Sequence, residues 1–296
     1  MIKVCIPFLL TEPDQILNQE IFGTRVSFEA NIFDGIVLKK LIDNKQFDLL
    51  LKGVVQMSNL SAFHFPTENA DYLESDIIFN TLIESLKIVG KNNIPYLILH
   101  SNLIRSISHF DYSEVLSKRK KFIKQYETLD KIAGNSNVIV CIENLPIIGN
   151  DGNDFDSVFV FPNDYGELNF KNVKVVWDIG HWAYTCAHFS ELSGYYRHVN
   201  TTPKFRDFFE IEDKIVRLHF SSFKNGYTTD GTLKHEEGII PQQGDFSENE
   251  LIDVCRTINS LERKFDMTLE IKEEKYTNRK NTILTIDWLK SNLSLN

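Results

Sequence analysis

The sequence has few cysteines and none in close pairs. The four of them, Cys5, Cys141, Cys186 and Cys255, are too far apart to form a CxxC motif. Nothing in this spacing indicates a disulfide framework or a zinc ribbon. Cys5 and Cys141 stand inside apolar runs, where a thiol behaves as a small core residue. We therefore expect free thiols in a reducing environment.

Long hydrophobic runs are also missing. No apolar stretch approaches the ~20 residues that a membrane-spanning helix needs. The N-terminal segment, MIKVCIPFLLTEPD, lacks a small-residue cleavage site, and its apolar run is typical of a first strand rather than of a signal peptide. The expectation is a soluble, cytoplasmic protein with no membrane partner.

Positive charge is scarce. The formal net charge is −9 and the sequence pI is about 5.4. The densest basic run, KRKK at 118–121, falls within a helical pattern and is predicted to be a solvated helix face. Proteins that bind nucleic acid usually carry a basic stripe, because phosphate neutralisation supplies most of that affinity. A nucleic-acid partner is thus disfavoured, although the charge alone does not exclude one.

Two phosphate-binding signatures are absent, since no GxGxxG follows the first strand and no GxxxxGK[ST] occurs. The sequence contains instead eight short apolar runs that alternate with helical patterns. The runs are residues 3–9, 25–30, 60–65, 95–101, 137–145, 173–180, 214–222 and 266–272. Such alternation predicts parallel strands joined by crossover helices. We predict an α/β fold, a (β/α)8 TIM barrel formed by residues 1–296 as one domain, in preference to an open doubly wound sheet.

Three helical patterns between these runs are well marked. They cover residues 75–90, residues 113–134 with Gly134 as the expected end, and residues 247–264. The last begins with Ser247 and Glu250 at the spacing of a capping box. The interval 146–172 is less regular, and its segment IGNDGNDFDS is predicted to be a loop.

Seven of the eight predicted strands end in a residue type that can bind a metal or move a proton. These are Glu29, His64, His100, Glu143 (followed by Asn144), Asp178 (with His181 three residues later), His219 and Glu270. The carboxyl ends of all strands of a TIM barrel meet at one face, where active sites lie. The spacings from His64 onward are 36, 43, 35, 41 and 51 residues, each of which fits one βα unit. The sequence therefore predicts one ring of side chains around a single mouth.

A single histidine near a strand end is more often a hydrogen-bonded structural residue than a ligand. Here three of only eight histidines hold this position on different strands, which favours a metal site. Imidazole and carboxylate without thiolate suit zinc, manganese or another borderline divalent ion. We predict a centre of one to three ions. The remaining residues His109, His188 and His198 do not follow the pattern and are expected at the surface or in loops.

The strand order suggests how the ligands group. Glu143, Asp178, His219 and Glu270 on the last four strands are predicted to hold one ion. His64 and His100 either complete a second metal site with Glu143 as the bridge, or bind substrate.

The segment TTDGTLKHEEGIIPQQGDFS after the seventh strand is predicted to be a long loop. Asp230 and His235 in this loop either hold a further ion together with His181, or His235 caps the loop.

The pieces CIENLP, WDIGHW, RLHFSS, PQQGDFS and LEIK occur in an order and spacing that resemble the xylose isomerase-like TIM-barrel superfamily. The resemblance covers roughly residues 3–290. This superfamily includes sugar and sugar-phosphate isomerases and epimerases, and zinc-dependent apurinic-site endonucleases of the endonuclease IV type. The motifs are specific for the superfamily and not for one activity.

Resemblance to the epimerase branch implies one divalent ion on Glu143, Asp178, His219 and Glu270. It implies that Glu143 and Glu270 are acid–base groups on opposite faces of the substrate carbon, while the ion polarises a carbonyl. His181 resembles the substrate-binding histidine of that branch, and Glu29 the glutamate that ends its second strand. Asn144 and His235 complete the expected substrate-binding set.

Resemblance to the endonuclease branch implies three zinc ions and nine ligands. Eight have matches, namely His64, His100, Glu143, Asp178, His181, His219, His235 and Glu270. At the ninth position, an Asp in that branch, this chain has Leu233, so that only Asp230 is available. The loop after Glu143 also carries Asp151, Asp154 and Asp156, which would repel a DNA backbone.

The function predicted from the sequence is a metal-dependent isomerase or epimerase of a small sugar or sugar phosphate. The alternative is an endonuclease IV-like zinc phosphodiesterase that acts on abasic DNA or another phosphodiester. Other metal-dependent chemistry on the same barrel, such as a dehydratase or an aldolase, and a non-enzymatic binding barrel are the further hypotheses. The oligomeric state is left open by the sequence.

Overall fold

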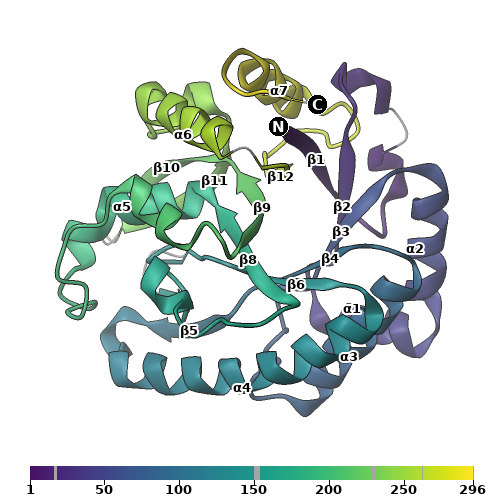
Figure 1. Cartoon of the computed structure of the whole chain (residues 1–296), viewed down its shortest axis with the longest axis horizontal. Coiled ribbons are helices and arrows are strands. Elements are labelled where there is room, and N and C mark those ends of the chain that lie inside the picture. Colours follow the sequence, from purple (N-terminus) through teal and green to yellow (C-terminus); the bar gives the residue numbers. More distant parts are fainter. Residues whose placement is uncertain (17–18, 150–153, 228–230, 232, 262, 296) are drawn as a thin grey trace.

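Eight parallel strands close into a barrel in the order β1-β12-β9-β8-β6-β4-β3-β2 (Figure 1). The computed structural model describes residues 1–296 except 17–18, 150–153, 228–230, 232, 262 and 296. The barrel strands are β1 (Ile2–Leu9), β2 (Ser27–Asn31), β3 (Leu60–His64), β4 (Tyr96–Leu99), β6 (Ile139–Glu143), β8 (Val173–Asp178), β9 (Ile215–Phe220) and β12 (Phe265–Leu269). Each of the eight predicted strands is one of these, and the predicted (β/α)8 barrel is confirmed.

The helices lie outside the barrel and cover its apolar outer surface (Figure 1). They are α1 (Gly35–Asp43), α2 (Gln46–Met57), α3 (Asp76–Lys91), α4 (Tyr112–Ser136), α5 (Ile179–Leu192), α6 (Glu248–Ser260) and α7 (Lys280–Asn292). The capping box predicted for α6 is confirmed, since Ser247 Oγ accepts from Glu250 N at 3.3 Å and Glu250 Oε2 accepts from Ser247 N at 3.2 Å. The predicted end of α4 at Gly134 is wrong, because the helix continues to Ser136 and ends at Asn137 in the left-handed conformation.

Two crossovers depart from the regular pattern. In the described part of the chain, β1 and β2 are joined by the short 3-10 helices η1 (Pro13–Ile16) and η2 (Gln19–Phe22) without an α-helix. Between β6 and β8, η4 (Pro162–Tyr165) is likewise the only helix among the described residues. This second gap corresponds to the interval 146–172, whose sequence predicts less regular structure.

Two small antiparallel sheets extend from the carboxyl ends of the barrel strands. One pairs β5 (Asn102–Ser106) with β7 (Asp154–Ser157), and the other pairs β10 (Ser222–Tyr227) with β11 (Leu233–Ile239). The second sheet corrects the prediction of a long loop after the seventh strand. It fixes the faces of residues 233–239, so that alternate side chains on β11 point the same way.

The barrel interior is layered. Ala62, Ile98, Cys141 and Val176, from β3, β4, β6 and β8, form a small apolar cluster of their own. Side chains two residues apart on a strand share a face, so the next positions along the interior are His64, His100, Glu143 and Asp178. The predicted ring therefore stands directly above an apolar layer, and the predicted burial of Cys5 and Cys141 in the core is confirmed.

The two ends of the described chain meet beside β1 and α7 (Figure 1). Ile2 N donates to Ser294 O at 2.9 Å, which ties the first strand to the segment after the last helix. Among the described residues, no helix combines the length and the apolar character needed to cross a membrane.

Candidate metal centre and pocket

The structure brings together the four residues predicted to hold one ion. Ligand atoms of Glu143, Asp178, His219 and Glu270 all lie within 4.8 Å of one another. His219 Nδ1 is 3.1 Å from Glu143 Oε2 and 3.2 Å from Glu270 Oε1. Glu143 and Asp178 are the last residues of β6 and β8, and Glu270 directly follows β12. Four neighbouring strands thus place their terminal polar side chains around one point.

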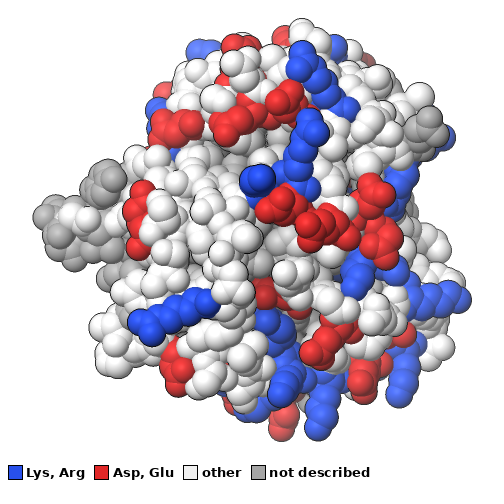
Figure 2. Space-filling model, turned by 60° about the vertical axis from the view of Figure 1, so that its left-hand side comes forward, with Lys and Arg blue, Asp and Glu red and all other residues white. Residues whose placement is uncertain are grey.

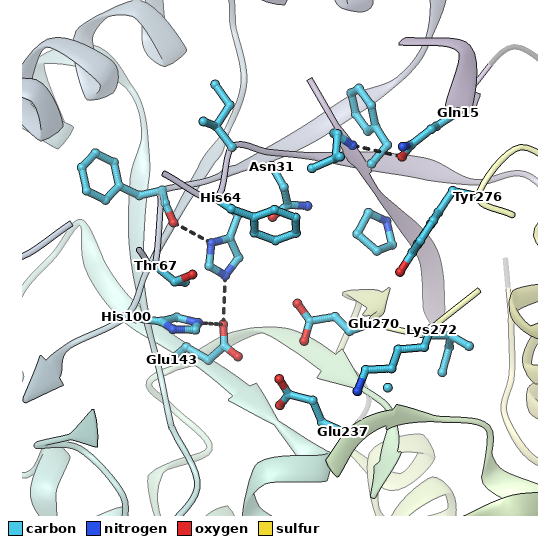
Figure 3. A pocket seen from close by; sticks show the side chains of 18 of the residues that line it. Gln15, Asn31, His64, Thr67, His100, Glu143, Glu237, Glu270, Lys272 and Tyr276 are labelled. Carbon is cyan, nitrogen blue, oxygen red and sulfur yellow. Dashed lines mark hydrogen bonds and ion pairs between the residues drawn. The ribbon is translucent and has the colours of Figure 1, made fainter. Parts of the chain in front are cut away.

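A second group shares Glu143 with the first. Ligand atoms of His64, His100 and Glu143 also lie within 4.8 Å of one another. Glu143 Oε2 is 3.5 Å from His64 Nε2 and 3.4 Å from His100 Nε2 (Figure 3). His64 Nδ1 donates to Phe65 O at 2.8 Å, which leaves Nε2 as the lone-pair nitrogen. This geometry fits the predicted second site with Glu143 as the bridge.

The motif WDIGHW folds tightly around the end of β8. Asp178 is the N-cap of α5, and its Oδ1 accepts from His181 N at 2.6 Å. Asn144 clamps the same turn, because its amide donates to Asp178 O at 3.0 Å and accepts from Asp178 N at 2.7 Å. A Cβ at Gly180 would lie 2.9 Å from Ser221 O, so glycine allows α5 to begin against the end of β9. The clamp keeps Asp178 close to His219.

His181 and His235 lie beside this centre, with Glu237 between them. His181 Nδ1 donates to Asn144 O at 2.8 Å, and its Nε2 is 2.6 Å from Glu237 Oε2. His235 is 1% exposed, and neither of its ring nitrogens has a hydrogen-bond partner among the described residues. Its Nδ1 is 3.9 Å from Glu237 Oε2. Asp230, the other residue expected in this group, lies outside the described residues.

Glu29 lies one layer lower in the barrel than His64, since it pairs with Ala62 while Asn31 pairs with His64. Its carboxylate is nevertheless within 4.8 Å of ligand atoms of His64, His219 and Glu270. Its side chain is fully buried, and its Oε2 is 3.1 Å from the guanidinium of Arg217 and 3.5 Å from His219 Nε2. Thr268 donates to the same oxygen at 2.9 Å. Glu29 therefore lies beneath His219.

A pocket of about 330 Å³ opens onto the centre. Figure 3 shows His64, His100 and Glu143 on one side of it, Lys272 and Tyr276 on the other, and Glu270 between them. The wall also carries apolar side chains, Pro7, Phe8, Leu9, Ile32, Phe33, Phe65 and Ile271. Of the residues predicted to contact substrate, His181 belongs to the described lining, whereas Glu29, Asn144 and His235 do not.

Several residues that line the pocket were not predicted from the sequence. Gln15, Asn31, Glu237, Lys272 and Tyr276 all face the pocket. Glu237 is two residues after His235, and this spacing places both on one face only if the segment is a strand. Lys272 is two residues after Glu270, but it follows the end of β12, where strand periodicity stops applying. Gln15 and Tyr276 come from segments without a periodic signal.

The pKa values of two carboxylates of the centre, Glu143 and Asp178, are shifted in opposite directions. Burial raises the pKa of Glu143, but His219 and His100 outweigh it and keep that pKa well below its usual value. Burial raises the pKa of Asp178 to about 7; His181 opposes this shift and the charge of Glu143 adds to it. Two carboxylates so close together resist joint ionisation unless a cation lies between them.

The same charges also shift the pKa values of His219 and His100. Burial lowers the pKa of His219, but Glu143, Glu270 and Glu29 raise it well above its usual value. Burial lowers the pKa of His100, and the charge of Glu143 only partly offsets the shift. Adjacent imidazoles therefore differ in their tendency to bind a proton.

The residues fit a divalent metal on the chemistry of their unpaired atoms. Glu143 Oε2, Asp178 Oδ2 and His219 Nδ1 are buried and have no hydrogen-bond partner among the described residues. Each such atom costs ~1–3 kcal/mol if it stays unpaired. A cation among them would remove this cost, and mixed nitrogen and oxygen donors suit zinc and manganese. These residues could therefore hold a divalent ion.

One prediction about the other histidines is wrong. His188 is predicted at the surface or in a loop, but it lies on α5, is 8% exposed and has its Nε2 2.5 Å from Asn225 Oδ1. His109 and His198 are exposed, as predicted. The predicted solvated face at 118–121 lies on α4, where Lys120 and Lys121 are exposed.

No protein-family model matches the sequence, and no curated protein sequence matches it. The fold is nevertheless similar to solved structures over almost its whole length. Protein TTHB071 from Thermus thermophilus, soaked with ZnCl2, is 16% identical with a TM-score of 0.62, over 98% of this chain and 97% of that chain. D-psicose 3-epimerase from Clostridium cellulolyticum H10, with D-tagatose, is 13% identical with a TM-score of 0.61, over 99% of each chain. Endonuclease IV from Thermus thermophilus is 12% identical with a TM-score of 0.55, over 98% of this chain and 99% of that chain.

These similarities show the class of fold to which the chain belongs. The chain has the fold of the xylose isomerase-like TIM barrels, and the resemblance found in the sequence is confirmed at the level of the fold. Most of the similar structures are enzymes, and they include both sugar epimerases and endonuclease IV.

Proposed function

We propose that the chain is a divalent-metal-dependent isomerase or epimerase of a small sugar or sugar phosphate. The observation that carries the proposal is the placement of Glu143 and Glu270. Their carboxylates reach His219 Nδ1 from two strands, at 3.1 and 3.2 Å, and both line the pocket of about 330 Å³. Two carboxylates around one ion can hold a substrate carbon between an acid and a base.

The residues divide into three roles. Glu143, Asp178, His219 and Glu270 would hold one zinc or manganese ion, which when bound supplies Lewis-acid polarisation of a substrate carbonyl. Glu143 and Glu270 would exchange the proton at the neighbouring carbon. His181, on the pocket wall, and the buried His235 near it would orient the substrate oxygens.

The two remaining candidates are better suited to positioning than to substrate contact. Asn144 is fully buried, and its amide is engaged by the backbone of Asp178. Glu29 is fully buried beneath His219. Both would act on the substrate only through the residues that they hold.

The pocket wall supports a small carbohydrate as the substrate. Its volume lies at the lower end of the range for small-molecule sites. Gln15, Asn31, Thr67 and Tyr276 supply hydrogen-bonding groups, while Phe8, Phe33 and Ile271 supply apolar surface. A sugar presents both hydroxyl edges and apolar C–H faces, so it can use both sides of such a wall.

The second candidate function is a phosphodiesterase, and the shared group of His64, His100 and Glu143 favours it. Two ions bridged by one carboxylate are common in phosphoryl chemistry. The face shown in Figure 2 gives it no added support, since acidic and basic side chains are interspersed there. Asp151 lies outside the described residues, and Asp154 and Asp156 belong to β7, so the predicted acidic rim stays a prediction.

One paired experiment tests the proposal. Protein loaded with zinc or with manganese is incubated in D2O with a panel of ketoses and ketose phosphates, and deuterium at the carbon next to the carbonyl is measured by NMR. The same preparations are tested for nicking of abasic-site DNA and cleavage of a phosphodiester reporter. Metal-dependent deuterium incorporation supports the isomerase. Nicking without deuterium exchange would replace it with the phosphodiesterase.

A further inference from the structure

A second polar cluster lies below the metal centre, around Arg217. This side chain is fully buried in β9, two residues before His219 and therefore on the same face of the strand. Its guanidinium donates to Thr268 Oγ1 at 3.0 Å and to Cys5 Sγ at 2.9 Å, and it lies 3.1 Å from Glu29 Oε2. A charge buried inside a barrel is costly unless it is paired and hydrogen-bonded. The cluster therefore fixes the place of both Arg217 and Glu29.

Glu29 connects this cluster to the centre above it. Its Oε2 accepts from Thr268 Oγ1 at 2.9 Å and from Arg217 Nε at 3.2 Å, and it lies 3.5 Å from His219 Nε2. Its Oε1 is buried and has no hydrogen-bond partner among the described residues. The carboxylate is thus held from below and keeps acceptor capacity for the imidazole above.

His219 needs two partners. Both ring nitrogens are buried, and neither makes a hydrogen bond of normal geometry to a described residue. Nδ1 faces Glu143 and Glu270, at 3.1 and 3.2 Å, and Nε2 faces Glu29. A histidine that binds a metal through one nitrogen almost always donates its other N–H to a carboxylate or a carbonyl, which fixes its tautomer and orientation.

We propose that Glu29, held by Arg217 and Thr268, is the orienting partner of His219. Glu29 accepts the Nε2 proton and so directs the Nδ1 lone pair to the metal centre. Glu29 and Arg217 are positioning residues, since they act through His219 and are not part of the described pocket lining. The inference rests on the metal centre of the proposed function, but it does not depend on which reaction the centre performs.

The structure supplies an internal contrast for the test. His64 donates from Nδ1 to Phe65 O at 2.8 Å and turns Nε2 toward Glu143 Oε2, at 3.5 Å. His219 is arranged the other way round. The two histidines should therefore hold opposite tautomers within one centre.

The first measurement uses the wild-type protein. Zinc is titrated into chain labelled with ¹⁵N-histidine, and the ring nitrogens are followed by NMR, with assignment from His64→Asn and His219→Asn. We expect His219 to be protonated at Nε2 and coordinated through Nδ1, and His64 to be protonated at Nδ1. Coordination of His219 through Nε2, as would occur if Glu29 were itself a ligand of the same ion, overturns the inference.

The second measurement uses variants. Glu29→Gln alone would leave Arg217 buried without its carboxylate, and the chain could fail to fold. We therefore combine it with Arg217→Met. Loss of an orienting partner typically weakens metal affinity ~10–100-fold, so we expect the zinc Kd to rise by this factor and the His219 tautomer to become mixed, while His64 keeps its tautomer.

Asp266→Asn is the matched control. Asp266 Oδ2 lies 3.4 Å from Arg217 Nη1, so the variant removes a charge next to the same guanidinium and keeps Glu29 and His219. We expect its zinc Kd to change by about fivefold or less, as for a partly exposed ion pair. A double variant with wild-type zinc affinity and an unchanged His219 tautomer overturns the inference. Wild-type protein that binds no zinc removes the metal centre itself, whereas zinc binding without sugar exchange contradicts only the proposed function.

Discussion

Glu270 and Glu143 are equivalent in distance to His219 but not in access. The side chain of Glu270 is 31% exposed, whereas that of Glu143 is 1% exposed and also faces His64 and His100. Glu270 is therefore the more accessible of the two proposed acid–base carboxylates. Glu143 is more strongly committed to holding the centre together.

Glu270→Gln should lower turnover in the deuterium-exchange assay by about 10²–10⁴-fold, the usual contribution of a positioned general base. The amide keeps the size of the side chain, so substrate affinity measured by calorimetry should change little. Metal content of the variant is measured in parallel, to separate loss of the base from loss of the ion. Glu274→Gln, at an exposed position four residues later, is the control and should keep full turnover. Undiminished exchange by Glu270→Gln would remove this residue from the catalytic role.

The burial of His235 should make the free energy of unfolding depend on pH. Burial lowers its pKa to about 3, whereas an unfolded histidine titrates near ~6.5. Between these two values the unfolded state binds more protons, so this residue makes the free energy of unfolding fall as the pH drops from about 6.5 toward 3. The slope is at most about 1.4 kcal/mol per pH unit.

Urea unfolding of metal-free protein from pH 7 to pH 4 measures this effect. His235→Gln should show a flatter loss of stability than the wild type, since the amide does not titrate. His109→Gln, at an exposed position, should follow the wild-type curve. Parallel curves for wild type and His235→Gln would contradict the assignment of a neutral buried imidazole.

Much of the centre could be predicted from single residues, for a physical reason. Polar side chains after buried strands are conspicuous, and parallel strands place their carboxyl ends together. Glu237 could not be found this way, because its place beside His181 depends on the register of β11 against β10. Arg217 left a usable signal, since a cation in the middle of an apolar strand, two residues from a predicted ligand, must share its face.

At the scale of elements, side-chain contacts attach the sheet of β10 and β11 to α5. Two strands alone are marginally stable. Here β11 is tied to α5 by Glu237 and His181 at 2.6 Å, and β10 by Asn225 and His188 at 2.5 Å. Histidines of α5 therefore help to position the pocket wall formed by Glu237 and Gly238, where Gly238 O also accepts from Lys272 N at 2.8 Å.

Glu237→Ala should loosen β11. We expect hydrogen exchange of its backbone amides to accelerate by about tenfold, which corresponds to the loss of about 1.4 kcal/mol, while β9 keeps its protection. Glu236→Ala is the matched control, because Glu236 is exposed on the same strand. If both variants exchange alike, the contact with His181 does not hold the sheet.

Helices and barrel strands were easier to predict than the small sheets. Strands such as β6 and β8 are apolar on both faces, as parallel strands covered by helices must be. The end of α4 was missed because Asn137, and not Gly134, adopts the left-handed conformation that closes the helix. Residues 222–239 gave no clear alternation of apolar and polar residues, so pairing between β10 and β11 could be recognised only in three dimensions.

At the scale of the whole molecule, removal of the metal should lower thermal stability. An ion present at 100 times its Kd stabilises the folded state by about 2.7 kcal/mol, which corresponds to a melting temperature lower by roughly 5–10 °C after chelation. Differential scanning calorimetry with and without a chelator measures the shift, and added zinc or manganese should reverse it. Glu143→Gln should show a much smaller response to the chelator. An equal response in this variant would place the stabilising ion elsewhere.

The barrel as a whole was predictable because its evidence is repeated along the chain. Eight strand-like runs with crossover lengths between them fit few architectures. The irregular connections are a different matter: η1 and η2 replace a helix between β1 and β2 and bring Gln15 to the pocket. No repeating pattern marks such a connection, so the pocket wall that contains Gln15 could not be predicted from the sequence.

The shared position of Glu143 has a thermodynamic consequence. A single oxygen, Oε2, lies between 3.1 and 3.5 Å from ring nitrogens of His64, His100 and His219. Two ions held by the two groups would both draw on this carboxylate, so they could not bind as independent events. By linkage, the affinity of each must depend on the occupancy of the other, and by the same factor in both directions. A metal titration would then follow a coupled isotherm, and the activity at partial loading would report the distribution of ions between two linked sites rather than the fraction of protein that is metallated.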